Sequence, residues 1–137
     1  MALVIGIVPQ FTDCLSQGRV MTLQNGMTAP MKCHWSAIAE IGVAIPLGLV
    51  GLANLVSRRK ETSAGLGVVG VALGALAVAF PTVLIGVCAD PMMICNMVMK
   101  PTLILSGIVT MAASLGLVVM ALRAQRASQV KMQGAAA

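Results

Sequence analysis

The chain has 137 residues, of which 58% are hydrophobic, 9% are charged and 2% are aromatic. Its mean hydropathy of +0.96 is too high for the core and shell of a water-soluble domain, so the composition predicts an integral membrane protein. The formal net charge of +5 does not indicate a nucleic-acid partner, because no aromatic side chains alternate with the basic ones to stack on bases.

Three apolar segments are long enough to cross about 30 Å of hydrocarbon as helices. The chain opens with MALVIGIVPQF (residues 1–11), which is only half of a span. We expect it to be re-entrant or the end of a helix that begins upstream, with a short interfacial segment as the alternative. The sequence therefore predicts an all-α, polytopic transmembrane helical bundle, with residues 1–137 forming one membrane domain. Its full spans are expected at 35–57, 64–87 and 101–122.

The basic residues predict the orientation of this bundle. Six of the nine lie in the 58–63 turn and the 123–137 tail, whereas Arg19, Lys32 and Lys100 lie in the other two loops. Because positive loops stay in the cytoplasm, we expect both termini to be cytoplasmic and the loops 12–34 and 88–100 to be exoplasmic. The expected location is the inner or plasma membrane, in contact with lipid.

Cysteines mark both of the loops expected outside. The first loop runs from Cys14 to Pro-Met-Lys-Cys33, and the second from Cys88 to Pro-Met-Met-Ile-Cys95, so the two halves repeat a helix, Cys, Pro-Met, Cys, helix pattern. The repeat predicts two helical hairpins side by side with their sulfur-bearing loops together. In an oxidising compartment four cysteines predict disulfides; we expect Cys14–Cys33 and Cys88–Cys95, with pairing between the loops as the alternative.

The same loops hold the ligand types of a soft-metal site. Thioether, thiolate and imidazole groups together select Cu(I), but methionine also fills irregular apolar surfaces. No cofactor is expected if the cysteines form disulfides, and copper is the alternative. The candidate ligands are Met31, Cys33, His34, Met92, Met93 and Cys95.

Small residues line two of the predicted helices. Gly70 and Gly74 are four residues apart in the third segment, and the last segment carries a stripe at the same spacing formed by Thr102, Ser106, Thr110 and Ser114. Such faces let helices approach closely, either inside the bundle or against a partner. Glu40, seven residues after Cys33 on the same helix face, is a carboxylate expected inside the membrane, beneath the cysteines or near interfacial water.

The stretches MKCHWSAIAEIG (31–42) and LIGVCADPMMICNMVMKP (84–101) resemble a family of small bacterial four-helix membrane proteins labelled as a domain of unknown function. The resemblance covers nearly the whole chain. It implies association with macrolide-exporter-type ABC transporters, and it carries over no catalytic residue.

Three functions remain open on this sequence. We expect a non-enzymatic accessory subunit of an ABC-type permease, with disulfides in its exoplasmic loops. The alternatives are an exoplasmic Cu(I)-binding or transfer protein and a quinone-linked thiol oxidase. This chain, however, lacks the Cys-x-x-Cys motif that such oxidases commonly use. The sequence leaves open the partner, the transported compound and the oligomeric state, including a homo-oligomer.

Overall fold

The structure is a computed structural model that describes residues 1–16, 18–57, 60–88 and 90–135. For residues 60, 61 and 130–135 it describes the backbone alone. Two of the basic residues that predict the orientation, Arg58 and Arg59, therefore lie outside the described residues, and so do the side chains of Lys60 and Lys131.

Helices dominate the described chain, in agreement with the predicted all-α bundle. Two π-helical segments, η1 and η2, follow α3 and precede α4 directly. The elements in chain order are α1 (Ala2–Thr12), β1 (Met21–Thr22), β2 (Thr28–Ala29), α2 (Lys32–Val56), α3 (Lys60–Ala79), η1 (Phe80–Leu84), η2 (Cys95–Met99) and α4 (Lys100–Ala135).

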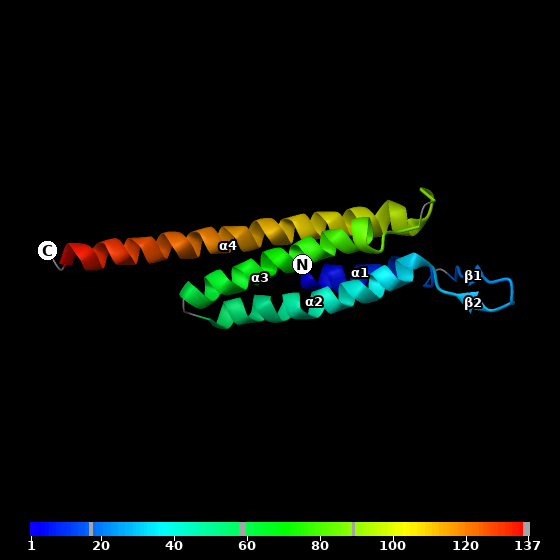
Figure 1. The fold of residues 1–137 in the computed structure, drawn as a ribbon, viewed down its shortest axis with the longest axis horizontal. Coiled ribbons are helices and arrows are strands. Elements are labelled where there is room, and N and C mark those ends of the chain that lie inside the picture. The colour runs from blue at the N-terminus through cyan, green and yellow to red at the C-terminus, as the bar shows by residue number, and fades with distance from the viewer. Residues whose placement is uncertain (17, 58–59, 89, 136–137) are drawn as a thin grey trace.

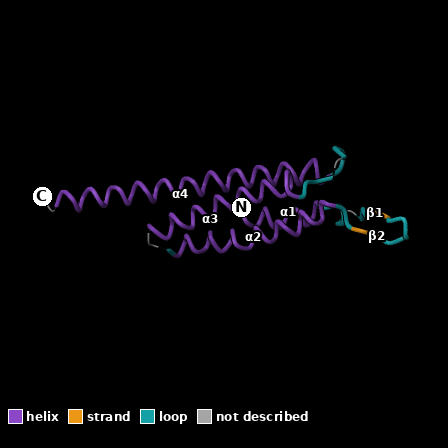
Figure 2. The backbone as a smooth tube through the Cα atoms, in the orientation of Figure 1, coloured by secondary structure: helices purple, strands orange, loops and turns teal. Residues whose placement is uncertain are grey.

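The helices lie nearly parallel to one long axis (Figure 1). Helix α1 packs on α2, α2 on α3 and α3 on α4, so the chain forms two helical hairpins side by side. Because α1 is short, the N-terminus lies about halfway along the bundle, whereas α4 extends beyond the other helices toward the C-terminus (Figures 1 and 2). The loops after α1 and after η1 lie at the same end of the molecule.

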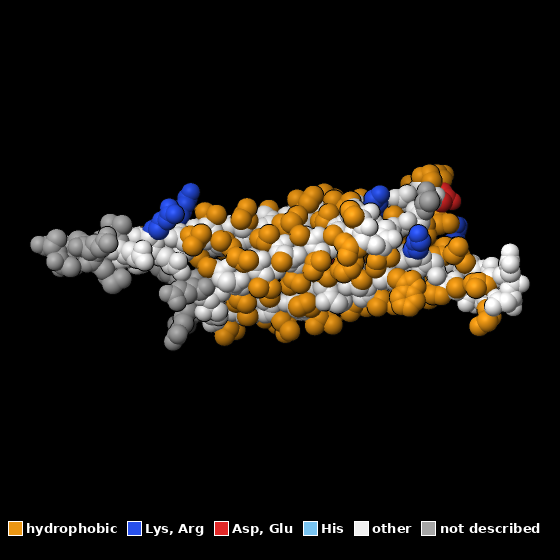
Figure 3. Space-filling model, viewed as in Figure 1, with side chains coloured by type: hydrophobic (Ala, Val, Ile, Leu, Met, Phe, Trp, Pro, Cys, Tyr) orange, Lys and Arg blue, Asp and Glu red, His pale blue; other side chains and the backbone are white. Residues whose placement is uncertain are grey.

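Three helical stretches within the described residues are long and apolar enough to cross a membrane, namely Lys32–Val56, Thr62–Leu84 and Cys95–Gln129. This confirms three full spans and a short apolar N-terminal helix. Apolar side chains cover the sides of the bundle and basic ones lie toward its two ends (Figure 3), as expected of a multi-pass membrane protein. Helix α4 outlasts its predicted span of 101–122, because the polar tail consists mostly of good helix formers.

Glycines bring α3 and α4 into close contact. A Cβ atom added at Gly74 would lie 3.1 Å from the carbonyl oxygen of Gly107, and one added at Gly70 would lie 3.1 Å from the Cβ of Ser114. Both glycines thus face α4 inside the bundle. The stripe on α4 faces inward as well, since Ser106 and Thr110 are buried and donate hydrogen bonds to the carbonyls of Leu103 and Ser106 at 3.1 and 2.7 Å.

A proline lies within or shortly after each π-helical segment. Pro81 is the second residue of η1, and Pro101 follows η2 by two positions. Proline lacks the N–H that an α-helix needs, and wider turns are one way in which a helix accommodates it. Gly86, with φ of 76°, then turns the chain out of the helix through a left-handed conformation. After this turn, Val87 and Cys88 pack against the core at the end of the bundle.

The loop between α1 and α2 projects beyond that end as a short hairpin (Figure 2). Strands β1 and β2 are antiparallel, with Met21 opposite Ala29 and Thr22 opposite Thr28. Sequence patterning did not predict strands here, because each consists of only two residues.

Candidate metal centre

All four cysteines meet at the end of the bundle where the two loops lie. Cys14 follows the residue that caps α1, Cys33 is in the first turn of α2, Cys88 is in the segment after η1, and Cys95 begins η2. We call these residues the four-cysteine cluster. Cys14, Cys33 and Cys95 are buried and Cys88 is half-buried, so the cluster is part of the core rather than of the surface.

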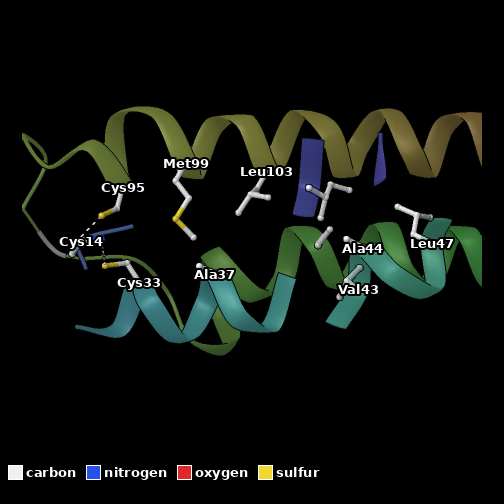
Figure 4. Packing of buried hydrophobic residues seen from close by; sticks show 11 residues of the cluster. Cys14, Cys33, Ala37, Val43, Ala44, Leu47, Cys95, Met99 and Leu103 are labelled. Atoms are coloured by element: carbon white, nitrogen blue, oxygen red, sulfur yellow. Dashed lines mark hydrogen bonds between the residues drawn. The ribbon is translucent and has the colours of Figure 1, made fainter. Parts of the chain in front are cut away.

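The four sulfur atoms lie within 4.8 Å of one another. The sulfur of Cys14 is 2.8 Å from that of Cys95 and 3.4 Å from that of Cys88, and the sulfur of Cys88 is 3.5 Å from that of Cys33. Figure 4 shows Cys14 between Cys33 and Cys95, with α2 on one side and the start of α4 on the other. Each hairpin contributes two of the four thiols.

These separations suit a single metal ion. Four metal–sulfur bonds of about 2.3 Å in a tetrahedron require sulfur atoms about 3.8 Å apart. The separations of 2.8, 3.4 and 3.5 Å are shorter than this value, so the sulfur atoms would move apart to form the tetrahedron around an ion. The amide of Cys14 also donates a hydrogen bond to the sulfur of Cys33 at 3.4 Å.

Polar contacts fix the elements that carry the cysteines. Asp13 accepts a hydrogen bond from the amide of Ser16 at 2.8 Å, and its other carboxylate oxygen lies 2.8 Å from Nδ1 of His34. The hydroxyl of Ser36 donates to the carbonyl of Gly86 at 2.9 Å. The first pair joins the end of α1 to the start of α2, and the second joins α2 to the loop that carries Cys88.

Ionisation of the buried groups follows from these surroundings. Burial raises the pKa of the Cys14 thiol above its usual value, and hydrogen bonds with the other three thiols raise it further. Although burial opposes ionisation of Asp13, hydrogen bonds with His34 and Ser16 hold the pKa of its carboxyl group below the usual value. Without metal the cluster therefore holds a protonated thiol at Cys14, and metal binding must displace that proton.

A cavity of about 150 Å³ opens beside the cluster. It gives access to Cys14 and Cys95 from the loop end of the bundle. Its lining consists of Cys14, Arg19, Met92, Met93, Ile94 and Cys95.

Five of the six metal-ligand candidates predicted from the sequence lie in or beside the four-cysteine cluster. Cys33 and Cys95 belong to the cluster, the sulfur of Met31 lies 3.9 Å from that of Cys88, and Met92 and Met93 line the cavity. His34 is outside the cluster, because its Nδ1 faces Asp13 and its ring packs against Trp35 with centroids 6.2 Å apart.

Cys14 and Cys88 were expected only as disulfide partners, and the structure adds both to the thiol set. All four cysteines are free among the described residues. The shortest sulfur–sulfur separation, Cys14 to Cys95, joins the two loops rather than one loop to itself. The Cys, Pro-Met, Cys repeat in the two halves had predicted that the two cysteine-bearing loops lie together. The disulfide pairing itself stays a prediction.

Glu40 lies deeper in the bundle than the cluster. It is fully buried on the face of α2 that also buries Cys33, Ser36 and Ala37, as the seven-residue spacing predicts. Neither carboxylate oxygen of Glu40 has a hydrogen-bond partner among the described residues.

The chain belongs to the family described as "Domain of unknown function (DUF4418)", whose model matches residues 2–120. No curated protein and no solved structure matches the chain.

Proposed function

We propose that this membrane protein of a family of unknown function binds one thiophilic metal ion between Cys14, Cys33, Cys88 and Cys95. The observation that carries the proposal is the approach of all four sulfur atoms to within 4.8 Å of one another. The sulfurs come from sequence positions as far apart as 14 and 95 and from both hairpins. A bound ion would therefore tie the two hairpins together at one end of the bundle.

Ligand chemistry limits the class of ion. Thiolates in a tetrahedral arrangement suit Zn²⁺ and the soft ions Cd²⁺ and Cu(I), whereas Mg²⁺ and Ca²⁺ require oxygen ligands. Among the described His, Cys, Asp and Glu side chains, the group of close metal-ligand atoms consists of cysteine sulfur alone. Asp13 and His34, the nearby oxygen and nitrogen donors, bind each other.

The test uses the full chain, reduced and purified in a mild detergent, and titrated with Cd²⁺. Thiolate coordination of Cd²⁺ gives ultraviolet charge-transfer absorption, so the spectrum reports on sulfur ligation directly. We expect saturation at one ion per chain with protection of all four thiols from alkylation. Cys14→Ser and Cys95→Ser should each weaken binding by at least about tenfold.

Met97→Leu is the matched control, because Met97 follows Cys95 by two residues but is 63% exposed and outside the cluster. It should keep the stoichiometry and the charge-transfer band. Four reducible thiols that show no Cd²⁺ absorption at micromolar metal would contradict the proposed function.

Thiol–disulfide exchange is the second candidate, and the 2.8 Å separation between the sulfurs of Cys14 and Cys95 favours it. If these cysteines form a disulfide, non-reducing peptide mapping of the purified protein will find a link between the two loops. The expected pairs Cys14–Cys33 and Cys88–Cys95 would instead give links within each loop.

The accessory role with an ABC-type permease remains a separate proposal. Its sequence support was the small-residue faces, and Gly70 and Gly74 pack against α4 inside the bundle. Those glycines therefore do not supply a docking surface. Affinity purification from mild detergent, followed by mass spectrometry, tests for a co-purifying permease.

Sidedness is proposed on the basic residues alone. Arg123 and Arg126 lie on the extended part of α4, whereas Arg19, Lys32 and Lys100 lie at the end of the bundle that holds the cluster. With Arg58, Arg59, Lys60 and Lys131 counted from the sequence, six basic residues stand against three. This asymmetry supports an exoplasmic position for the four-cysteine cluster.

A further inference from the structure

The cavity beside the four-cysteine cluster is lined mainly by sulfur-containing and apolar side chains. Two of its six lining residues are methionines, two are cysteines of the cluster, and Ile94 is apolar. Met92 is 82% exposed, whereas Met93 is half-buried and packs against the core residues. One exposed and one half-buried methionine thus line the same cavity as Cys14 and Cys95.

A third thioether lies against the cluster from the side of the other loop. The sulfur of Met31 is 3.9 Å from the sulfur of Cys88. Thioethers are neutral, polarisable ligands that bind Cu(I) well and compete poorly for Zn²⁺ in water. Their position next to the thiols distinguishes this site from a structural zinc site, which cysteine and histidine alone complete.

We infer that the four-cysteine cluster takes up monovalent copper, and that Cu(I) reaches it through the cavity by way of Met92 and Met93. This inference rests on the proposed function and names its metal and its entry route. Copper remains Cu(I) throughout. Each bond from copper to a ligand of the donor is replaced by a bond to a thioether and then to a cysteine sulfur, and the displaced thiol protons pass to water.

Arg19 gives the cavity a positive charge. A guanidinium group opposes the entry of a bare cation but attracts an anion. Copper(I) held by two thiolates carries a net negative charge, so Arg19 suits a donor of this kind. A Cu(I)–glutathione complex is therefore the probe for the test.

The experiment compares loading rates of the full-length, reduced protein in detergent. Cu(I) is supplied as its glutathione complex, Zn²⁺ is supplied separately, and loading is followed by loss of reactive thiols. The double variant Met92→Leu with Met93→Leu keeps side-chain volume and removes the thioethers. We expect it to load Cu(I) at least about tenfold more slowly, to the same final stoichiometry, with Zn²⁺ loading unchanged.

Met97→Leu is the matched control. Met97 lies in η2, two residues after Cys95, and is 63% exposed, but it does not line the cavity. It should load Cu(I) at the wild-type rate. An unchanged Cu(I) rate in the double variant, or equal slowing for Zn²⁺ and Cu(I), would overturn the thioether route. Failure of the wild type to bind either ion would instead overturn the proposed function.

Discussion

Glu40 lies on the buried face of α2, one helical turn beyond Ser36 and Ala37. Its exposed fraction is 0%, and within the described residues neither oxygen has a hydrogen-bond partner. A buried polar group without a partner costs about 1–3 kcal/mol of folding free energy. Membrane helices contain few such carboxylates, and those present usually line a functional interior.

We predict that Glu40→Leu raises the stability of the bundle in detergent. The change removes the unpaired oxygens and fills the same interior position with an apolar group, so the free energy of unfolding should rise by about 1–3 kcal/mol. Thermal unfolding followed by circular dichroism measures this. Glu40→Gln keeps two polar atoms and should gain less. A loss of stability in Glu40→Leu would show that the carboxyl group has a favourable partner inside the membrane.

Sequence spacing was sufficient to place Glu40 and Cys33 on one helix face, because an α-helix repeats every 3.6 residues. It was not sufficient for the four-cysteine cluster. Cys14 and Cys95 are separated by 80 intervening residues, and their approach depends on how two hairpins pack. The pairing of Asp13 with His34 was missed for the same reason, since it joins the ends of two different helices.

Helix α3 depends on glycine for its contact with α4. A Cβ at Gly74 would lie 2.8 Å from Cγ of Met111, 3.1 Å from the carbonyl oxygen of Gly107 and 3.2 Å from the amide of Met111. The methionine side chain can move, but the backbone atoms cannot do so without separating the helices. In lipid, such close packing replaces the hydrophobic effect as the force between helices.

We predict that Gly74→Leu lowers the yield of folded, inserted protein and destabilises the remainder by about 1–3 kcal/mol or more, because the side chain forces α3 away from α4. Gly116→Ala, on α4, is the matched control. A Cβ there meets no atom within 4 Å, and alanine favours the helix, so stability should stay equal or rise by up to about 1 kcal/mol. Size-exclusion chromatography and thermal unfolding measure both variants. Normal folding of Gly74→Leu would contradict the close contact.

A predicted span ends close to the end of its helix where the apolar sequence and the helix stop at the same residue, and far from it where the helix continues into polar sequence. Residues 35–57 agree with α2 to within a few positions, since Ser57 caps this helix. Helix α4 reaches Ala135 because membrane thickness limits the apolar stretch and not the helix itself. The π-helical segments Phe80–Leu84 and Cys95–Met99 leave no periodic signal in a uniformly apolar sequence.

At the scale of the whole molecule, the two ends of the bundle differ in chemistry. The β1–β2 hairpin is at one end, where the four-cysteine cluster also lies, and the last turn of α2 and the first turn of α3 are at the other (Figure 1). The cluster end meets an oxidising environment if it is exoplasmic and a reducing one if it is cytoplasmic. Orientation therefore decides whether the thiols need a metal ion to protect them from disulfide formation.

The last prediction tests this orientation with cysteines placed at the two ends. The native cysteines are buried or half-buried and would report poorly, so all four are first replaced by serine. Asn25→Cys is then introduced in the exposed hairpin and Ser57→Cys at the end of α2. A membrane-impermeant maleimide applied to intact cells should label position 25 but not position 57, because in the proposed orientation the basic residues keep the end of α2 in the cytoplasm. Permeabilised cells, in which both positions should react, control for accessibility. The reverse pattern would place the four-cysteine cluster in the cytoplasm. There glutathione keeps thiols reduced and copper circulates as thiolate complexes. A metal site would then have to compete with those thiols for its ion.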